Sequence, residues 1–500
     1  MNMQTPCCVG RSDTHTEQTI LNIKDKLMNK FFHKSILFFA CITMLSCNNQ
    51  NRSSEADSQT LFTGESGEVK LVVLDPGHFH ASLLQKFPQP RVNDTVYVYA
   101  PEGEELEQYL ASIEAYNTRS ENPTSWVEIV YTGDDYLDKM IDDRKGNVVI
   151  LAGNNKKKTE YIYAAINAGY NVLSDKPMAI NRENFYLLSD AFERAKENDV
   201  YLYDVMTERY EIVNSLTREL VNNSELFGEL QKGTTDDPAI VMQNLHHFYK
   251  EVSGVPLVRP AWFYDVEQQG EGMVDVGVHL VDLVQWQSFS DEVIDYRNDI
   301  VLNSVTHWPT RLTLEQFTRS TKLSAYPDFL QKYVKDSVLE VFANGTINYQ
   351  LKGVNVSITA LWNYEAAKGS GDAYNGYIKG TNATIEIVQD SSVDYIKQLF
   401  ISKDSSIDEQ TFDANISNAV NDLQQTYPFL TVEKVSDGRY QFIAPVEFRK
   451  GHEDFFGMVA EKYFEFLVNR DMPDWEISNM IAKFSLTTSA LESVKNQDSE

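Results

Sequence analysis

The stretch LVVLDPGHFHASLL, residues 71–84, decides how the folded part of the chain begins. A run of apolar residues is followed by a Pro-Gly turn and a second apolar pattern, which predicts a buried strand, a tight turn and a helix. Such a unit opens a dinucleotide-binding domain, but the Gly-x-Gly-x-x-Gly fingerprint is absent. Gly77 is the only glycine of the turn, and His78 and His80 flank Phe79.

Strand and helix patterns alternate along residues 69–204. The segments between the predicted strands carry apolar residues at helical spacing, and the strands themselves are expected at 70–74, 95–99, 127–131, 147–152, 171–173 and 200–203. Six short strands that alternate with helices predict a parallel, doubly wound sheet. We therefore expect an N-terminal Rossmann-like, dinucleotide-binding domain over 69–205.

The pattern changes after Asp204. Helices are expected at 210–222 and 274–287, and strand-like runs follow at 337–342, 346–351, 354–361 and 383–388. Asn344-Gly345 is a pair that favours a hairpin turn between two of these runs. Residues 206–500 are therefore expected to form a C-terminal α+β domain with a mostly antiparallel open sheet and two closing helices.

Residues 28–47, MNKFFHKSILFFACITMLSC, have the features of an export signal. A basic start precedes an apolar core that is shorter than the about 20 residues of a membrane-spanning helix. Met-Leu-Ser-Cys resembles a bacterial lipoprotein box, which would make Cys47 the lipidated first residue. We expect a signal peptide over 1–46 with Met28 as the true start, a polar tether over 47–68, and an exported, periplasmic or cell-surface protein held at the membrane only by its lipid anchor.

The composition narrows the classes of partner. The 500 residues carry 73 acidic and 44 basic side chains, a net charge of −29. A surface this acidic would repel phosphate, so nucleic acid is not an expected partner. All four cysteines lie at or before Cys47, and the rest of the chain therefore has no disulfide, thiolate metal site or cysteine nucleophile.

The first candidate catalytic motif is GYNVLSDKPMA, residues 169–179. Asp175-Lys176-Pro177 follows a predicted strand at the carboxyl edge of the sheet, which is where such sheets bind ligands. Pro177 fixes the turn, and Lys176 could hold a ribose or substrate hydroxyl and favour its deprotonation. The alternative is a solvated loop lysine.

The second motif is GEGMVDVGVHLVDLVQW, residues 270–286. Asp275, His279 and Asp282 share one face of an otherwise apolar helix. Burial of three polar groups is costly unless they are paired, so His279 oriented by a carboxylate is a candidate general base. The alternative is a histidine that only packs in the core.

Together, Asp175-Lys176-Pro177 and Asp275-Val-Gly-Val-His279-Leu-Val-Asp282 resemble the glucose–fructose oxidoreductase / inositol dehydrogenase / MocA (Gfo/Idh/MocA) family. Its members carry Glu-Lys-Pro after the fifth strand and Asp-x-Gly-x-His-x-x-Asp at the start of a helix in the second domain. The resemblance covers about 69–300 clearly and the remainder loosely. It implies a nicotinamide cofactor, a small carbohydrate substrate and a homo-oligomer, with the substrate and oligomer contacts made by residues 206–500.

By this resemblance Lys176 and His279 are catalytic and Asp275 supports them. Lys176 would lie beside the nicotinamide and the substrate hydroxyl, and His279 would take the hydroxyl proton as hydride leaves the same carbon. The family's Asn after the fourth strand corresponds to Asn155, while Lys158 stands where the family has His.

The opening turn can be aligned with the family in two ways. Residues 75–80 can cover the glycine fingerprint with only its middle glycine kept, or Gly77 can be the last glycine in a shortened loop. We prefer the second, because Ala81 and Leu84 then continue the helix. Phosphates would meet backbone N–H groups at a helix start in either case. The residues expected at the cofactor are Pro76, Gly77, His78, Phe79, His80, Asn154, Asn155, Asp175, Lys176 and Pro177.

Two other readings of this turn remain. Asp75, His78 and His80 could form a metal site, although no further carboxylate stands nearby in the sequence, and we expect no metal. The histidines could also simply pack in a tight turn.

The choice of dinucleotide and the substrate contacts rest on weaker signals. The second strand ends in TVYVYAPE, 95–102, without the acid that binds the adenosine ribose, so NAD and NADP both remain, and the absence of a following Arg favours NAD. Aromatic side chains commonly stack on sugar faces, although core packing would explain them equally. The residues expected near substrate are Arg209, Tyr210, His246, His247, Trp262 and Asp282.

These observations predict an exported NAD(P)-dependent oxidoreductase acting on a sugar, polyol or glycoside hydroxyl. Because an exported enzyme cannot exchange NAD with the cytosol, we expect a tightly bound cofactor. One alternative is an NAD-dependent glycoside hydrolase that oxidises its substrate transiently with the same Lys176 and His279. Another is a non-catalytic sugar-binding lipoprotein; the missing glycines favour it, whereas the intact Lys176 and His279 argue against it.

Overall fold

The computed structural model describes residues 61–252, 255–368 and 370–499. The predicted signal peptide, Cys47 and most of the predicted tether lie outside the described residues. Within the described part of the chain, no helix combines the length and apolar character that crossing a membrane requires.

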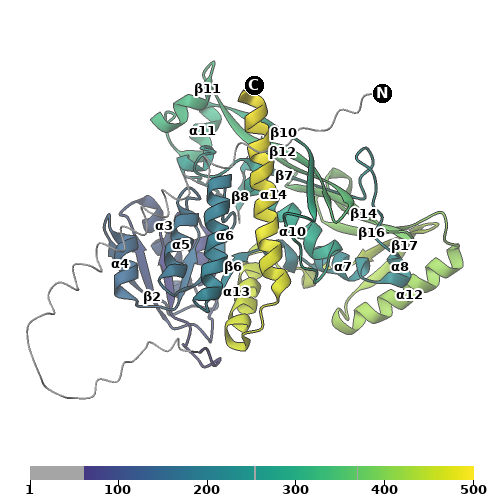
Figure 1. Ribbon diagram of the computed structural model, residues 1–500, viewed down its shortest axis with the longest axis horizontal. Helices are drawn as coiled ribbons and strands as arrows, with labels where there is room; N and C mark the ends of the chain where they lie inside the picture. Colours follow the sequence, from purple (N-terminus) through teal and green to yellow (C-terminus); the bar gives the residue numbers. More distant parts are fainter. Residues whose placement is uncertain (1–60, 253–254, 369, 500) are drawn as a thin grey trace, which may run out of the picture. The chain divides into compact units, whose positions relative to one another are not determined.

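The N-terminal domain is built on a parallel sheet (Figure 1). Its order is β3-β2-β1-β4-β5-β6, which is the doubly wound arrangement predicted from the alternating pattern. The central strands are wholly buried between helices, as parallel strands must be. The strands are β1 (Leu71–Leu74), β2 (Thr95–Ala100), β3 (Val127–Thr132), β4 (Val148–Leu151), β5 (Asn171–Asp175) and β6 (Leu202–Val205).

Four helices connect these strands at the expected places: α3 (Glu104–Thr118), α4 (Tyr136–Asp143), α5 (Lys158–Asn167) and α6 (Arg182–Glu197). The helix after β1 is shorter than the sequence predicted, because α2 (His80–Leu83) is a single turn. Pro88 and Pro90 follow closely and cannot continue a helix.

The second domain contains a mixed, mostly antiparallel sheet of 10 strands. Only β7 and β13 pair in parallel, so the predicted α+β class is confirmed. The strands of the main path, in spatial order, are β10 (Ile300–Thr313), β12 (Val338–Leu351), β13 (Val354–Glu365), β7 (Ile240–Tyr249), β14 (Ala373–Lys379), β15 (Ala383–Gln389), β16 (Gln398–Lys403), β18 (Arg439–Ile443) and β17 (Thr431–Ser436).

The hairpin predicted at Asn344-Gly345 is wrong. Both residues lie inside β12, where the Asn344 side chain donates to Trp308 O (3.1 Å) and accepts from Trp362 N (2.8 Å). The amide thus replaces backbone partners next to a bulge in β10. The turn falls instead at Lys352-Gly353, where φ is 49° and 79°.

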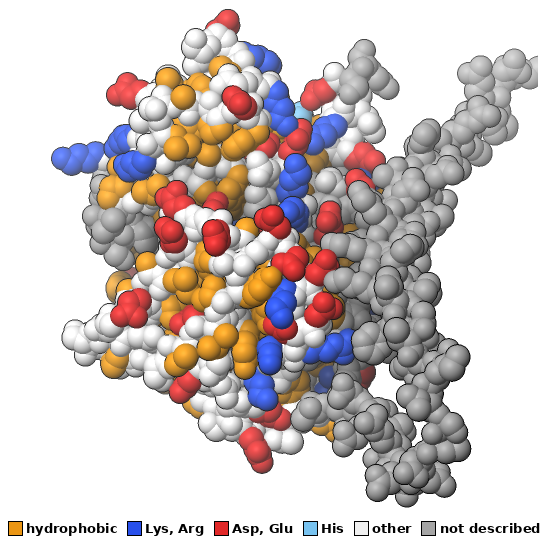
Figure 2. All heavy atoms as spheres, turned by 90° about the vertical axis from the view of Figure 1, so that its left-hand side faces the viewer, with side chains coloured by type: hydrophobic (Ala, Val, Ile, Leu, Met, Phe, Trp, Pro, Cys, Tyr) orange, Lys and Arg blue, Asp and Glu red, His pale blue; other side chains and the backbone are white. Residues whose placement is uncertain are grey.

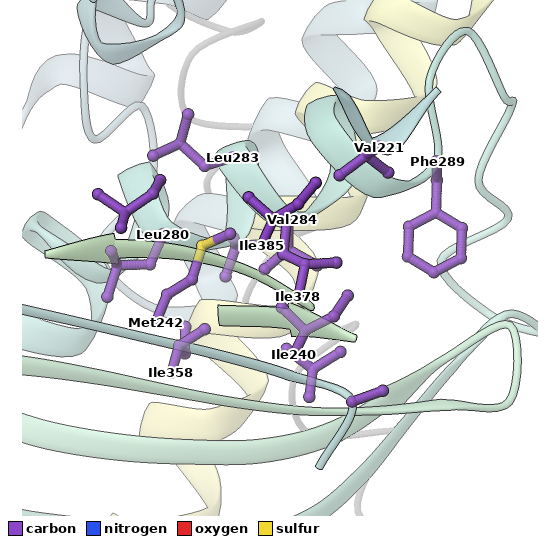
Figure 3. Packing of buried hydrophobic residues seen from close by; sticks show 14 of the residues in the cluster. Val221, Ile240, Met242, Leu280, Leu283, Val284, Phe289, Ile358, Ile378 and Ile385 are labelled. Carbon is purple, nitrogen blue, oxygen red and sulfur yellow. The ribbon is translucent and has the colours of Figure 1, made fainter. Parts of the chain in front are cut away.

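Helices cover one face of this sheet and form its core (Figure 3). α10 (Gly277–Ser288) contributes Leu280, Leu283 and Val284, which pack with the sheet residues Met242 and Ile358. α7 (Ile212–Val221) and α12 (Glu409–Thr426) also supply side chains to this cluster. The face of α10 that carries His279 and Asp282 points away from this core.

The helix predicted at 274–287 is interrupted. α9 (Gly272–Asp275) ends before α10 begins at Gly277. α9 approaches β12 so closely that a Cβ at Gly272 would overlap the carbonyl group of Ala343. Glycine is therefore required where Asp275 is brought toward the Rossmann sheet.

The last two helices return to the Rossmann domain. The ring of Tyr463 in α13 (His452–Asn469) stacks on Tyr203 of β6 at 5.9 Å, and α14 (Asp474–Ser499) lies beside α6 and α10 (Figure 1). The second domain therefore packs against the Rossmann domain through α13 and α14. On the face drawn in Figure 2, acidic side chains are spread between hydrophobic ones, in keeping with the net charge of −29.

Candidate functional site

Two loops meet at the carboxyl ends of β1 and β4, the point where the strand order reverses. The N–H groups of Gly77 and His78 both donate to the carbonyl oxygen of Ala152, at 3.2 Å each. A Cβ at Gly153 would clash with the Asp75 carbonyl oxygen and lie 3.0 Å from Gly77 N. Gly153 thus permits a contact that uses two of the loop's backbone donors.

A histidine pair lies between this contact and the end of β5. His80 Nδ1 is 2.9 Å and His78 Nδ1 is 3.8 Å from Asp175 Oδ2. Burial lowers the pKa of both imidazoles well below the ordinary value, and neighbouring cationic groups lower it further, so both are neutral at pH 7. Asp75, which the sequence placed with them, instead accepts a hydrogen bond from Tyr161 at 2.7 Å.

Buried amides and an amine surround the same edge. Lys158 Nζ donates to Asn155 Oδ1 (2.5 Å) and to the Asp175 carbonyl oxygen (3.1 Å), and burial lowers its pKa to about 8. Asn155 Nδ2 donates to the Gln269 carbonyl oxygen at 2.7 Å, and Asn154 donates to the Gln268 side chain at 2.7 Å. Both asparagines therefore connect the Rossmann domain to the second domain.

Lys176 and Asp275 form an ion pair across the two domains, with 2.7 Å between Lys176 Nζ and Asp275 Oδ1. Burial alone would raise the pKa of Asp275, but the Lys176 charge and hydrogen bond lower it below the ordinary value. The two motifs singled out in the sequence thus meet in space.

His279 lies next to this pair on α10, and its Nδ1 atom is buried without a hydrogen-bond partner among the described residues. Burial, followed by the charge of Lys176, lowers its pKa to about 4. The imidazole is therefore neutral near pH 7 and has one nitrogen free for a ligand. The sequence suggested that a carboxylate orients His279, but among the described residues no carboxylate is hydrogen-bonded to it, and Asp282 binds Arg209 and Lys483 instead.

Asp282 and Arg209 belong to a buried ion network instead of the substrate site. Arg209 binds Asp282 through Nε and Nη2 (2.6 and 2.7 Å) and also pairs with Glu476 at 2.9 Å. Lys483 Nζ lies 2.6 Å from Asp282 and 2.7 Å from Asp204. This network connects β6, η1 (Thr207–Tyr210), α10 and α14 behind His279, so the predicted contact of Arg209 and Asp282 with substrate is corrected.

Three charged or titratable residues near His279 carried no signal in the sequence. Glu208 and Lys397 form an ion pair at 3.3 Å; burial opposes ionisation of Glu208, but Lys397, His279 and His452 lower its pKa to about 2. His452, the first residue of α13, lies 5.0 Å from His80 between ring centroids. Glu208, Lys397 and His452 lie 71, 118 and 173 positions from His279 in the sequence, and only folding brings them together.

The remaining predicted substrate residues lie in different parts of the structure. His246 and His247 both face Asp372, with Nδ1–Oδ distances of 3.4 and 2.8 Å, and His246 Nε2 is buried without a partner among the described residues. Trp262 Nε1 donates to Glu105 of α3 at 3.2 Å, so this ring lies at the opening turn. Tyr210 is half-buried at the end of η1.

Family models match both domains. Residues 72–203 match "Oxidoreductase family, NAD-binding Rossmann fold", and residues 216–495 match "Putative oxidoreductase C terminal domain". A crystal structure of a "putative oxidoreductase" from Parabacteroides merdae is 48% identical, covers 87% of this chain and 100% of that chain, and has a TM-score of 0.86. The chain belongs to the Gfo/Idh/MocA oxidoreductase family.

More distant members of this fold include known enzymes. Biliverdin reductase from Synechocystis sp. PCC 6803, in complex with biliverdin and NADP+, is 10% identical over 85% of this chain and 98% of that chain, with a TM-score of 0.51. Levoglucosan dehydrogenase in its apo form is 14% identical over 85% and 97%, with a TM-score of 0.52. These two likenesses show the Gfo/Idh/MocA fold alone. A search of the curated proteins found no match.

The Gfo/Idh/MocA Rossmann domain is an NAD-binding one, which confirms the predicted cofactor class, NAD or NADP. Two observations fit such a cofactor here: the free buried Nδ1 of His279 beside Lys176, and a cleft of about 140 Å³ along the opening turn and α3. Gly77, His78 and Phe79 line this cleft, opposite Arg259. Gly77, His78 and Lys176 are the residues that would hold the cofactor.

In this Gfo/Idh/MocA member, two of the backbone amides expected at the cofactor phosphates are bonded within the protein. The amides of Gly77 and His78 are bonded to Ala152, and α2 is too short to present a strong helix N-terminus. Pro76 has no N–H group, and Phe79 is exposed with its ring 4.5 Å from that of His78. The amides of Gly77 and His78 would bind phosphate only after separating from Ala152.

Proposed function

We propose that the chain is an oxidoreductase that moves hydride between a carbohydrate hydroxyl and a bound NAD or NADP. The observation that carries this proposal is the buried, unpartnered Nδ1 of His279 beside the Lys176–Asp275 ion pair. An unsatisfied buried nitrogen costs about 1–3 kcal/mol, so its retention is expected where a ligand hydroxyl donates to it. Family membership supports the redox chemistry.

Each side chain has a distinct task in this proposal. Neutral His279 accepts the proton of the substrate hydroxyl, while Lys176 donates a hydrogen bond to the same oxygen and limits its charge. Asp275 fixes the Lys176 ammonium by their 2.7 Å ion pair. When bound, the nicotinamide supplies the hydride acceptor or donor.

A carbohydrate substrate is supported by the chemistry of the surrounding groups. His246 Nε2 is a second buried nitrogen without a partner among the described residues. Glu208 and Lys397 add an acceptor and a donor nearby. Several fixed donors and acceptors around one base match a molecule with several hydroxyl groups.

The test is nicotinamide analysis of the protein purified without added cofactor. Denatured wild-type protein is expected to release NAD(H) or NADP(H), identified by mass spectrometry. When a panel of sugars and glycosides is added, the absorbance of reduced nicotinamide is expected to change for the wild type and for His307→Gln, a control outside this site. Lys176→Met and His279→Gln are expected to lose turnover, and His279→Gln is expected to retain the released cofactor.

A wild-type protein that releases no nicotinamide and binds none in solution would contradict this function. Unchanged turnover in His279→Gln would contradict the role given to that imidazole. We further propose that the enzyme is exported and anchored through Cys47, which the signal-like segment 28–47 supports.

A further inference from the structure

Three metal-ligating side chains converge at the opening turn. His78 and His80 come from the turn after β1, and Asp175 is the last residue of β5. One ligand atom from each lies within 4.8 Å of the others. No other group of this kind is found in the described part of the chain.

The distances suit one ion. In a tetrahedral site with metal–ligand bonds of about 2.0–2.1 Å, ligand atoms lie about 3.3–3.4 Å apart. Asp175 Oδ2 is 2.9 Å from His80 Nδ1 and 3.8 Å from His78 Nδ1. Each of these two separations therefore needs a change of about half an ångström, and the two imidazole nitrogens lie within 4.8 Å of each other.

We propose that His78, His80 and Asp175 bind a divalent transition-metal ion such as Zn²⁺. Two imidazoles and one carboxylate form the donor set of Zn²⁺ and Fe²⁺ sites that keep open coordination positions. The site is independent of the proposed hydride transfer, since neither Lys176 nor His279 is a ligand.

The hydrogen bond between His80 and Asp175 accounts for the position of His80 but not for that of His78. His80 Nδ1 and Asp175 can share a proton at 2.9 Å. His78 Nδ1, however, accepts the His80 backbone N–H at 3.4 Å, so it carries no proton of its own. His78 Nδ1 and the Asp175 oxygen are then two acceptors 3.8 Å apart, and a cation between them would replace the long His80 N–H contact with a stronger attraction.

The nearby lysines do not cancel this attraction. Lys176 Nζ is held by Asp275 at 2.7 Å, which offsets its charge. Lys158 Nζ is bonded to Asn155 and to the Asp175 carbonyl oxygen, and so does not occupy the carboxylate. The Asp175 side chain is left to the two imidazoles and to its own following amide, Lys176 N at 3.0 Å.

The ion would face the cleft. His78 lines the cavity of about 140 Å³ between the opening turn, α3 and Arg259. Three protein ligands leave at least one coordination position for an oxygen atom of a molecule in that cavity. The ion would then supply positive charge beside the opening turn, where the amides of Gly77 and His78 are bonded to Ala152.

The experiment is metal titration of the full chain after treatment with a chelator. Zn²⁺ binding is followed by calorimetry, and Co²⁺ binding by its visible absorption, in the wild type, His78→Gln, Asp175→Asn and the control His307→Gln. His307 pairs with Glu271 and Asp498, away from this turn. Segment 1–60 also contains His and Cys, so the readout is the difference between variants.

We expect one site per chain that is present in the wild type and in His307→Gln. Loss of one ligand is expected to weaken it by at least about 100-fold, since even residues behind the ligands contribute about 10–100-fold. Equal stoichiometry and affinity in the wild type and His78→Gln would overturn the proposal. If Asp175→Asn unfolds, His78→Gln still decides, because the His78 side chain is 19% exposed and its replacement leaves the Asp175–His80 bond in place.

Discussion

Replacement of Lys483 by Met tests the buried ion network behind the candidate site. Lys483 is fully buried, and its Nζ atom lies 2.7 Å from Asp204 and 2.6 Å from Asp282. Methionine keeps most of the volume but removes the charge, so Asp204 loses its ion pair while Arg209 still holds Asp282. Removing one partner of a buried ion pair costs about 3–5 kcal/mol.

This free energy translates into a measurable change in Tm. An unfolding entropy of about 2.1 cal/mol/K per residue gives about 0.9 kcal/mol/K if residues 62–500 unfold together. Lys483→Met should therefore lower Tm by about 3–5 °C in differential scanning calorimetry. The control is Lys462→Met, which removes an exposed pair with Glu465 and should cost about 0–1 kcal/mol.

The loss should also depend on pH with a defined sign. Burial raises the pKa of Asp204 above its ordinary value, and Lys483 opposes this rise. Without Lys483 the folded pKa rises further, so the folded state keeps a proton that the unfolded state releases above about pH 4. Stability of the variant then falls as pH rises through the folded pKa. Equal deficits at pH 5 and pH 8, or a Tm no lower than that of Lys462→Met, would refute this reasoning.

Three further outcomes are expected. The His279 imidazole should titrate with a midpoint near pH 4 by NMR of labelled histidines, with His279→Gln for assignment; a midpoint near 6.5 would contradict its burial beside Lys176. Gly153→Ala should lower stability by about 1–3 kcal/mol because its Cβ clashes with the Asp75 carbonyl, whereas Gly103→Ala, where the nearest atom would be 3.5 Å away, should not. Cys47→Ser should move the protein from the membrane to the soluble fraction, and an unchanged distribution would argue against lipidation.

The parallel sheet was predictable because its signals are local. Each buried strand of the Rossmann domain is a short apolar run, and each connection carries helical spacing, so element type and order follow from neighbouring residues. The Asn344-Gly345 turn failed for a non-local reason. The Asn344 amide is bonded to Trp308 and Trp362 on two other strands, and these partners keep the chain extended.

In the candidate site, too, local features were predictable from the sequence and contacts between distant residues were not. Lys176 and Asp275 could be paired from their motifs, since each motif marks the start or end of one element. The role of Asp282 could not, because its partners Arg209 and Lys483 lie 73 and 201 residues away. A carboxylate at helical spacing from a histidine can either orient that histidine or pair with a neighbouring helix. For Asp282 the neighbouring helix is α14, whose Lys483 binds it, and the sequence does not show where α14 packs.

The opening turn lacks the glycine fingerprint, and the structure gives the free-energy cost of binding phosphate there. Two backbone hydrogen bonds, from Gly77 and His78 to Ala152, must break before these amides can bind phosphate. At about 0.5–1.5 kcal/mol each, this costs about 1–3 kcal/mol, or about 5–150-fold in affinity. A cofactor retained through purification must therefore gain its affinity elsewhere, from the Lys176 end, from Arg259 across the cleft, or from an ion held by His78. Loss of retention in His78→Gln but not in His307→Gln would assign part of that affinity to His78, and loss of retention in the chelator-treated wild type that Zn²⁺ restores would assign it to the ion.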